Sequence, residues 1–201
     1  MESGLARVVV ACDSEEIQQA IESAGGEAVL TDPDLPSGSD RIYAALKQVD
    51  AASEHDIIVN LQGDMPTLDP NIIASVLKPL SENQRCDIAT LAAEIHTEEE
   101  RENPAVVKLA LAQTGQALYF SRNLIPANEG PHYHHIGIYA YRPAALEQFV
   151  SLPPSPLEQR EKLEQLRALE AGMIIHAEVV DTVPLGVDTP EQLDMARKIL
   201  G

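Results

Sequence analysis

Three residues of chemical interest, Gln62, Gly63 and Asp64, follow the apolar segment 56–59 and precede Pro66. They supply an amide, a flexible glycine and a carboxylate. If segment 56–59 is a buried strand, these residues lie at its carboxyl end, which is the edge where open α/β sheets bind ligands. A carboxylate there can hold a metal ion against a phosphate, so the sequence predicts such a site at Asp64. The alternative is that Asp64 only forms the turn.

A second aspartate, Asp188, lies in segment 186–190, just before a predicted helix. Proteins typically hold Mg²⁺ through one or two carboxylates together with substrate phosphates. Asp64 and Asp188 are therefore a candidate pair of Mg²⁺ ligands. The alternative is that Asp188 only caps the helix, and sequence spacing alone does not decide between the two.

A loop of small residues, 36–41, precedes another predicted helix and contains Ser37 and Gly38. Small residues allow backbone N–H groups to approach a ligand closely, and a helix N-terminus favours an anion. The loop is therefore a candidate nucleotide-binding segment, with an ordinary capped loop as the alternative.

Histidines cluster in segment 132–135, but no cysteine or carboxylate lies nearby at zinc-ligand spacing, so we expect no zinc site. In a strand, alternate residues share a face, which here carries His135, Gly137, Tyr139 and Tyr141. A polar and aromatic face with a glycine suits the wall of a sugar site. The alternative is a half-buried strand of an antiparallel sheet.

Segment 155–167 is rich in charge, and Ser155, Pro156 and Glu158 predict the start of a helix. We expect this helix to run to about residue 171. Most of its charges suit a solvated face with i,i+4 pairs such as Glu158 with Lys162. Only one or two of its polar residues are expected to face a site.

The elements that position these residues follow from the apolar periodicity. Strand 7–11, a helix after residue 13 and strand 27–30 form a βαβ unit, which implies parallel strands. The rest of the pattern predicts helices beginning near residues 40, 69, 155 and 189, a hairpin over 106–121, and strands over 56–59, 86–95, 135–141 and 174–180. The fold class is therefore α/β, with a doubly wound, mostly parallel sheet and a smaller α+β lobe.

The composition narrows the choice of partners. The chain has 201 residues and a net charge of −18, which disfavours nucleic acid as a partner. No apolar run reaches the ~20 residues of a membrane helix, and we expect a cytoplasmic protein that does not bind membranes. Cys12 and Cys86 are expected to be buried, reduced thiols, which agrees with that location.

Several motifs, in order, resemble those of the 3-deoxy-manno-octulosonate cytidylyltransferases, also called CMP-Kdo synthetases. The resemblance covers essentially the whole chain. Its pieces are Leu-Pro-Ser-Gly-Ser-Asp-Arg (35–41), Val-Asn-Leu-Gln-Gly-Asp-Met-Pro (59–66), Tyr-Phe-Ser-Arg-Asn-Leu-Ile-Pro (119–126), His-Ile-Gly-Ile-Tyr-Ala-Tyr-Arg (135–142), Leu-Glu-Gln-Leu-Arg (163–167) and Gly-Val-Asp-Thr-Pro (186–190).

The resemblance implies a nucleotide-diphospho-sugar transferase type of fold and a reaction in which CTP and Kdo give CMP-Kdo and pyrophosphate for lipopolysaccharide biosynthesis. The two aspartates, Asp64 and Asp188, would hold Mg²⁺ and are the catalytic pair. The residues matched to the nucleotide are Ser37, Gly38, Gln62 and Gly63. Those matched to the sugar acid are Gln62, Arg122, His135, Tyr139, Glu164 and Gln165.

The resemblance also implies one nucleotidylyltransferase domain over 1–201, with a nucleotide-binding part (1–104 and 172–201) and a lobe for sugar binding and dimerisation (105–171). Relatives are homodimers. They begin with a strand, a Pro-Ala-Arg loop and a Gly-Lys that this sequence does not show. We therefore expect an incomplete N-terminus, a central strand absent between the first and third strands, and weak or no activity from this chain alone.

Two other functions stay open at this point. One is a cytidylyltransferase for a different sugar acid, such as 8-amino-Kdo or sialic acid. The other is a non-catalytic remnant that binds a sugar or a partner.

Overall fold

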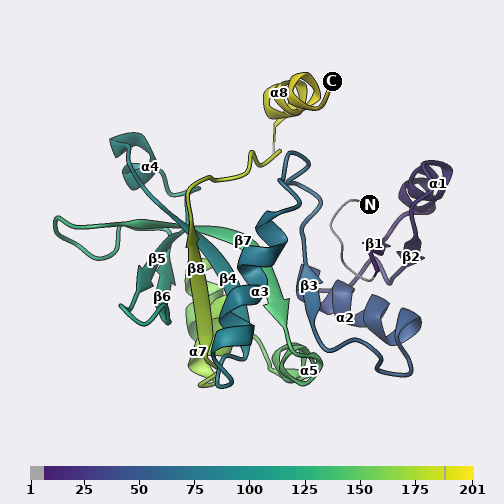
Figure 1. Cartoon of the computed structure of the whole chain (residues 1–201), viewed down its shortest axis with the longest axis horizontal. Coiled ribbons are helices and arrows are strands. Elements are labelled where there is room, and N and C mark those ends of the chain that lie inside the picture. The colour runs from purple at the N-terminus through teal and green to yellow at the C-terminus, as the bar shows by residue number, and fades with distance from the viewer. Residues whose placement is uncertain (1–6, 188) are drawn as a thin grey trace.

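The computed structural model describes residues 7–187 and 189–201, in which helices flank a central sheet (Figure 1). The strands are β1 (Val10–Cys12), β2 (Ala28–Leu30), β3 (Ile58–Asn60), β4 (Ile88–Glu94), β5 (Lys108–Leu111), β6 (Ala117–Ser121), β7 (Tyr133–Tyr141) and β8 (Ile175–Val180). The helices are α1 (Glu15–Ser23), α2 (Gly38–Val49), α3 (Ile72–Glu82), α4 (Glu98–Glu102), α5 (Pro143–Ser151), α6 (Pro156–Glu161), α7 (Gln165–Glu170) and α8 (Pro190–Leu200).

The main sheet is organised around β7. Its order is β6-β5-β7-β4-β8, and β3 pairs with β7 as well. Strand β7 runs antiparallel to β3, β4 and β5, whereas β4 and β8 are parallel. The predicted α/β class is confirmed, but the expectation of a mostly parallel main sheet is wrong. The sheet is mixed, because β7 runs antiparallel to β3, β4 and β5, and β5 pairs antiparallel with β6. Strand β3 pairs with the end of β7 that holds Tyr139, and this pairing joins the two halves of the sequence in one sheet.

The predicted N-terminal βαβ unit is confirmed, since β1 and β2 pair in parallel as a separate two-stranded sheet. The sequence indicates a helix after residue 13. The N-cap of α1 is Ser14, whose side chain accepts a hydrogen bond from the backbone N–H of Glu16. Asp13 pairs instead with Arg41, whose Nη2 lies 3.1 Å from its carboxylate.

A hollow of about 150 Å³ separates β1 from β3, and no ladder joins these two strands within the described residues. The resemblance predicts a strand at this place. Apolar side chains from β1 or its approach, α2 and β3 line the hollow, among them Val9, Ala11, Ile42, Leu46 and Val59.

The core has two layers, one on each face of the main sheet. On one face, α3 packs Val76 and Leu80 against Leu91 of β4 and Ile138 of β7. On the other face, helices α5 and α7 pack against residues that include Tyr139. The inward positions of α3 match the predicted helical periodicity. The two layers bury β7 from both sides, and this strand carries the candidate residues His135 and Tyr139.

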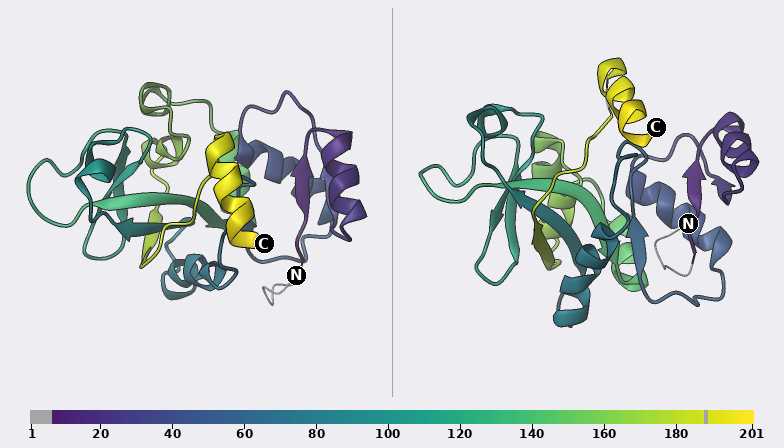
Figure 2. Two further views of the ribbon diagram at one scale, coloured as in Figure 1. Left: turned by 90° about the horizontal axis from the view of Figure 1, so that it is seen from above. Right: turned by 45° about the horizontal axis from the view of Figure 1, so that its top comes forward.

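Two helices differ from expectation or stand apart. The single helix expected over 155–171 is two helices, α6 and α7, because Lys162 adopts a left-handed conformation with φ of 56°. Helix α8 begins with the predicted cap at Thr189 and lies away from the main sheet (Figures 1 and 2). No described helix is both long and apolar enough to cross a membrane.

Candidate active site

The carboxyl end of β3 and the middle of β7 form the first part of the site. Asn60 lies directly opposite Tyr139 in the β3–β7 ladder. Gln62 follows, and its Nε2 lies 3.7 Å from the position that a Cβ on Gly137 would occupy. The structure therefore brings Gln62 over the face of β7 that the sequence singled out.

His135 is buried on this face and is held by two kinds of contact. Its ring meets Phe120 edge-on at a centroid distance of 4.9 Å and Tyr139 at 5.5 Å. Its Nε2 lies 3.0 Å from the Thr90 hydroxyl oxygen, and that hydroxyl also lies 2.8 Å from the carbonyl oxygen of Ile138. Because a hydroxyl has one proton and a carbonyl can only accept, we assign the Nε2–H tautomer, which leaves Nδ1 as an acceptor.

Burial lowers the pKa of His135 from 6.5 to about 3, so the imidazole is neutral at pH 7. A neutral ring at this position can bind a polar substrate group. It cannot supply positive charge to a phosphate. This agrees with the sugar-binding role that the resemblance implies and disfavours a role in charge stabilisation.

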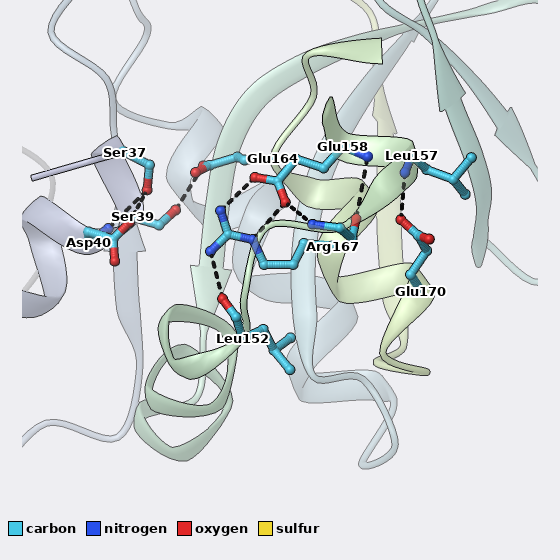
Figure 3. A network of polar contacts seen from close by, with 10 residues as sticks. Ser37, Ser39, Asp40, Leu152, Leu157, Glu158, Glu164, Arg167 and Glu170 are labelled. Atoms are coloured by element: carbon cyan, nitrogen blue, oxygen red, sulfur yellow. Dashed lines mark hydrogen bonds and ion pairs between the residues drawn. The ribbon is translucent and has the colours of Figure 1, made fainter. Parts of the chain in front are cut away.

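The start of α2 forms the second part of the site. Ser37 is the N-cap of α2 and accepts from the backbone N–H of Asp40, while its hydroxyl donates to the Asp40 carboxylate at 2.6 Å. Gly38 is exposed, as a segment that contacts a ligand through its backbone must be. Ser39 is fully buried and donates to Glu164 Oε1 at 2.8 Å. This bond joins the candidate nucleotide loop to the start of α7 (Figure 3).

The turn between α6 and α7 presents Glu164 and Gln165, and Arg122 holds this turn. The Arg122 guanidinium donates to the carbonyl oxygens of Glu161 at 3.0 Å and Lys162 at 3.4 Å. In this arrangement the guanidinium contacts main-chain carbonyls beside the candidate sugar residues. Its pairing with the sugar carboxylate stays a prediction.

Glu164 is a carboxyl group in a partly buried position. Its pKa is raised, first because burial penalises the carboxylate, and the hydrogen bond from Ser39 offsets part of this effect. Its second oxygen, Oε2, is buried and has no hydrogen-bond partner among the described residues. Gln165, the other candidate on α7, is also buried.

A buried ion pair fixes α6 against α7. Arg167 donates to Glu158 through Nε at 2.8 Å and Nη2 at 2.5 Å, and through Nη1 to the Leu152 carbonyl at 3.2 Å (Figure 3). Glu158 also accepts from the Ser155 backbone N–H, which completes a capping box. The expected pair of Glu158 with Lys162 is wrong, because Lys162 leaves the helix in the left-handed conformation. The sequence motifs assigned no role to Arg167. The available signal was an arginine that follows the capping-box glutamate, Glu158, in the chain.

The predicted metal site is only partly described. Asp64 is exposed at the end of β3, as a metal ligand that meets substrate must be. The backbone N–H of Val187 donates to the Asp64 carbonyl oxygen at 2.7 Å. Asp188 lies outside the described residues. Within the described ranges, no three His, Cys, Asp or Glu side chains cluster as a metal site. The oxygen chemistry of Asp64 suits Mg²⁺ completed by substrate phosphates.

Comparison with known proteins supplies a family. The sequence model described as cytidylyltransferase matches residues 1–175. A 3-deoxy-manno-octulosonate cytidylyltransferase from Bradyrhizobium sp. is 61% identical over 99% of this chain and 82% of its own. One of the same name from Paramagnetospirillum magneticum is 58% identical over 100% of this chain and 83% of its own.

A solved structure shows the same fold. The structure of a CMP:2-keto-3-deoxy-manno-octonic acid synthetase complexed with CTP superposes with a TM-score of 0.89 and 38% sequence identity. The match covers 98% of this chain and 81% of that chain.

Proposed function

The chain belongs to the 3-deoxy-manno-octulosonate cytidylyltransferase family, and we propose that it transfers CMP from CTP to Kdo, giving CMP-Kdo and pyrophosphate. The observation that carries this proposal is the 61% identity to a relative of that name over 99% of the chain. The activated sugar would serve lipopolysaccharide biosynthesis. The alternatives of 8-amino-Kdo, sialic acid or a non-catalytic remnant are not favoured, because the relatives matched over the whole chain are named for Kdo.

In the proposed reaction, the anomeric hydroxyl of Kdo attacks the α-phosphorus of CTP and pyrophosphate leaves. The chain's contribution is to hold the two substrates in line. Ser37 and Gly38 would contact the nucleotide through the start of α2. Gln62, which lies over Gly137, would orient the sugar, and the neutral His135 would accept a hydrogen bond through Nδ1.

We also propose that Mg²⁺ is bound by Asp64 and Asp188. The exposed carboxylate of Asp64 and the passage of the chain beside it at Val187 support this assignment. Held by these two carboxylates, a Mg²⁺ ion would supply positive charge that offsets the negative charge developing on the phosphates in the transition state. A cation at this place would also allow a chain of net charge −18 to accept a triphosphate.

Two further assignments stay proposals. A homodimer follows from the resemblance, with segment 105–171 as the contact. A cytoplasmic location fits the two free, buried cysteines, Cys12 and Cys86, and the use of CTP.

Acceptor competition tests the proposed substrate. The chain is supplied with CTP and Mg²⁺ together with equal concentrations of Kdo, 8-amino-Kdo and sialic acid, and the CMP-sugars are separated by anion-exchange chromatography. We expect CMP-Kdo as the main product. A dominant product from another acid would overturn the Kdo assignment. No product from any acid, together with no Mg²⁺-dependent binding of CTP, would point to a remnant that binds only a sugar or a partner.

A further inference from the structure

Two buried polar atoms face the site without a hydrogen-bond partner in the described part of the chain. They are the amide nitrogen Nδ2 of Asn60 and the carboxylate oxygen Oε2 of Glu164. Asn60 is only 3% exposed. An unpaired buried donor or acceptor destabilises the folded state, so atoms of this kind often mark a place where a ligand supplies the missing hydrogen bond.

Both residues border the same face of β7. Asn60 lies directly opposite Tyr139 in the ladder, and paired residues in an antiparallel sheet point to the same side. Glu164 reaches this side from α7, where Ser39 binds its other oxygen at 2.8 Å. Burial, and after it the charges of Tyr141 and Glu164, raise the pKa of Tyr139. Gln62 lies over the neighbouring Gly137.

The two atoms have complementary needs. The Asn60 amide nitrogen can only donate hydrogen bonds, and Glu164 Oε2 in the ionised form can only accept one. A hydroxyl group does both at once, because its oxygen accepts and its proton is donated. Kdo carries several hydroxyls, and the ribose of CTP carries two, so the tests below measure both substrates.

We propose that Asn60 is a specificity-determining residue that donates to a hydroxyl of the sugar acid, and that Glu164 accepts the proton of the same hydroxyl. This inference rests on the proposed function, since it names a further residue for the Kdo side of that site. It goes beyond the residues matched through the family motifs, which do not include Asn60.

The first test compares Asn60→Ala with the unchanged protein. We expect KM for Kdo to rise about tenfold, as the loss of about one hydrogen bond predicts, with KM for CTP changed less than twofold. Asn83→Ala is the matched control: Asn83 lies at the end of α3, and its Nδ2 is 3.0 Å from His176 Nε2, away from β3 and β7. Both KM values should stay unchanged in this control.

The second test uses Kdo analogues that each lack one hydroxyl. If Asn60 binds a particular hydroxyl, the unchanged protein and Asn60→Ala should have the same KM for the analogue that lacks it, while the tenfold difference persists for the other analogues. A purely structural role of Asn60 would give the same ratio for every analogue. Asn60→Leu keeps the side-chain volume and replaces Asn60→Ala if the smaller residue impairs folding.

Calorimetric titration of Kdo separates this inference from the proposed function, because binding does not need turnover. Kdo binding that is tenfold weaker in Asn60→Ala supports the inference even where no CMP-Kdo forms. An unchanged affinity for Kdo in Asn60→Ala, or a larger effect on CTP than on Kdo, overturns it. Absence of Kdo binding by the unchanged protein overturns the inference and the Kdo assignment together.

Discussion

Asp64 combines an exposed carboxylate with a backbone carbonyl that is tied to Val187. If this carboxylate holds Mg²⁺, Asp64→Asn should lower kcat/KM by about 10²–10³-fold, the usual cost of losing one preorganised charge-stabilising group. Steady-state kinetics with CTP and Kdo measure this effect. Asp56→Asn is the control, because Asp56 is an exposed carboxylate at the other end of the same strand. Equal rates for Asp64→Asn and the unchanged protein would remove Asp64 from the metal site.

His135 makes a prediction about stability and pH. Its pKa is lowered from 6.5 to about 3 by burial, so the folded state favours the neutral ring and the unfolded state binds a proton first. Its contribution is therefore full above pH 6.5 and is lost as the pH falls from 6.5 towards 3. His135→Gln removes this titration.

Urea unfolding at several pH values checks this prediction. The difference in unfolding free energy between the unchanged protein and His135→Gln should shrink as the pH falls through that window. His96→Gln is the control, since His96 is exposed and should give a small difference at every pH. A constant difference for His135→Gln would show that the ring does not change its protonation in this range.

Sequence reasoning at the level of single residues depended on motifs and on alternation. It placed His135, Gly137, Tyr139 and Tyr141 on one face of a strand, and in the structure the rings of His135, Tyr139 and Tyr141 lie next to one another. It did not find Asn60, because the value of this residue comes from its pairing with Tyr139, about 80 positions away, and strand register is not written in local sequence. Ser39 was missed because its hydrogen-bond partner, Glu164, is 125 positions away in the chain.

At the scale of elements, the α6–α7 pair shows how a local exception redirects a helix. The sequence of 156–171 has no glycine or proline after Pro156, so its periodicity predicts one continuous helix. The left-handed Lys162 and the ion pair of Arg167 with Glu158 instead fold it into two short helices. Tertiary contacts of this kind override local helix propensity.

The Arg167–Glu158 pair should matter for stability because both side chains are largely buried, at 8% and 13% exposed. Arg167→Met leaves Glu158 charged and unpaired, and we expect a loss of about 3–5 kcal/mol in the free energy of unfolding. Arg197→Met is the control: Arg197 and Asp194 are both 68% exposed, so the loss should be below about 1 kcal/mol. Urea denaturation compares the two, and similar losses for both variants would contradict the structural role of the buried pair.

The ranges of the strands were predicted better than the pairing between the strands. The expected hairpin is present as β5 and β6, and β4, β7 and β8 lie close to the expected ranges. The mixed sheet was not predicted, because the central antiparallel place of β7 follows from long-range pairing with β3, β4 and β5.

At the scale of the whole molecule, the net charge of −18 acts against the folded state through self-repulsion. Raising NaCl from about 10 to about 150 mM shortens the Debye length from about 30 to about 8 Å. We expect Tm to rise by about 2–4 °C, equivalent to about 1 kcal/mol. The double variant Glu99→Gln/Glu102→Gln, which neutralises two exposed carboxylates of α4, should respond less to salt. A salt response equal to that of the unchanged protein would contradict this explanation.

The proposal that this chain joins CMP to Kdo is tested by detecting the two products of the reaction. The purified chain is incubated with CTP, Kdo and Mg²⁺, and CMP-Kdo is identified by mass spectrometry while pyrophosphate is quantified in parallel. We predict that both products form in equal amounts, in proportion to protein, and only when Kdo is present. Pyrophosphate release that does not depend on Kdo, or a CMP-sugar formed from another acid in preference to Kdo, would contradict this assignment.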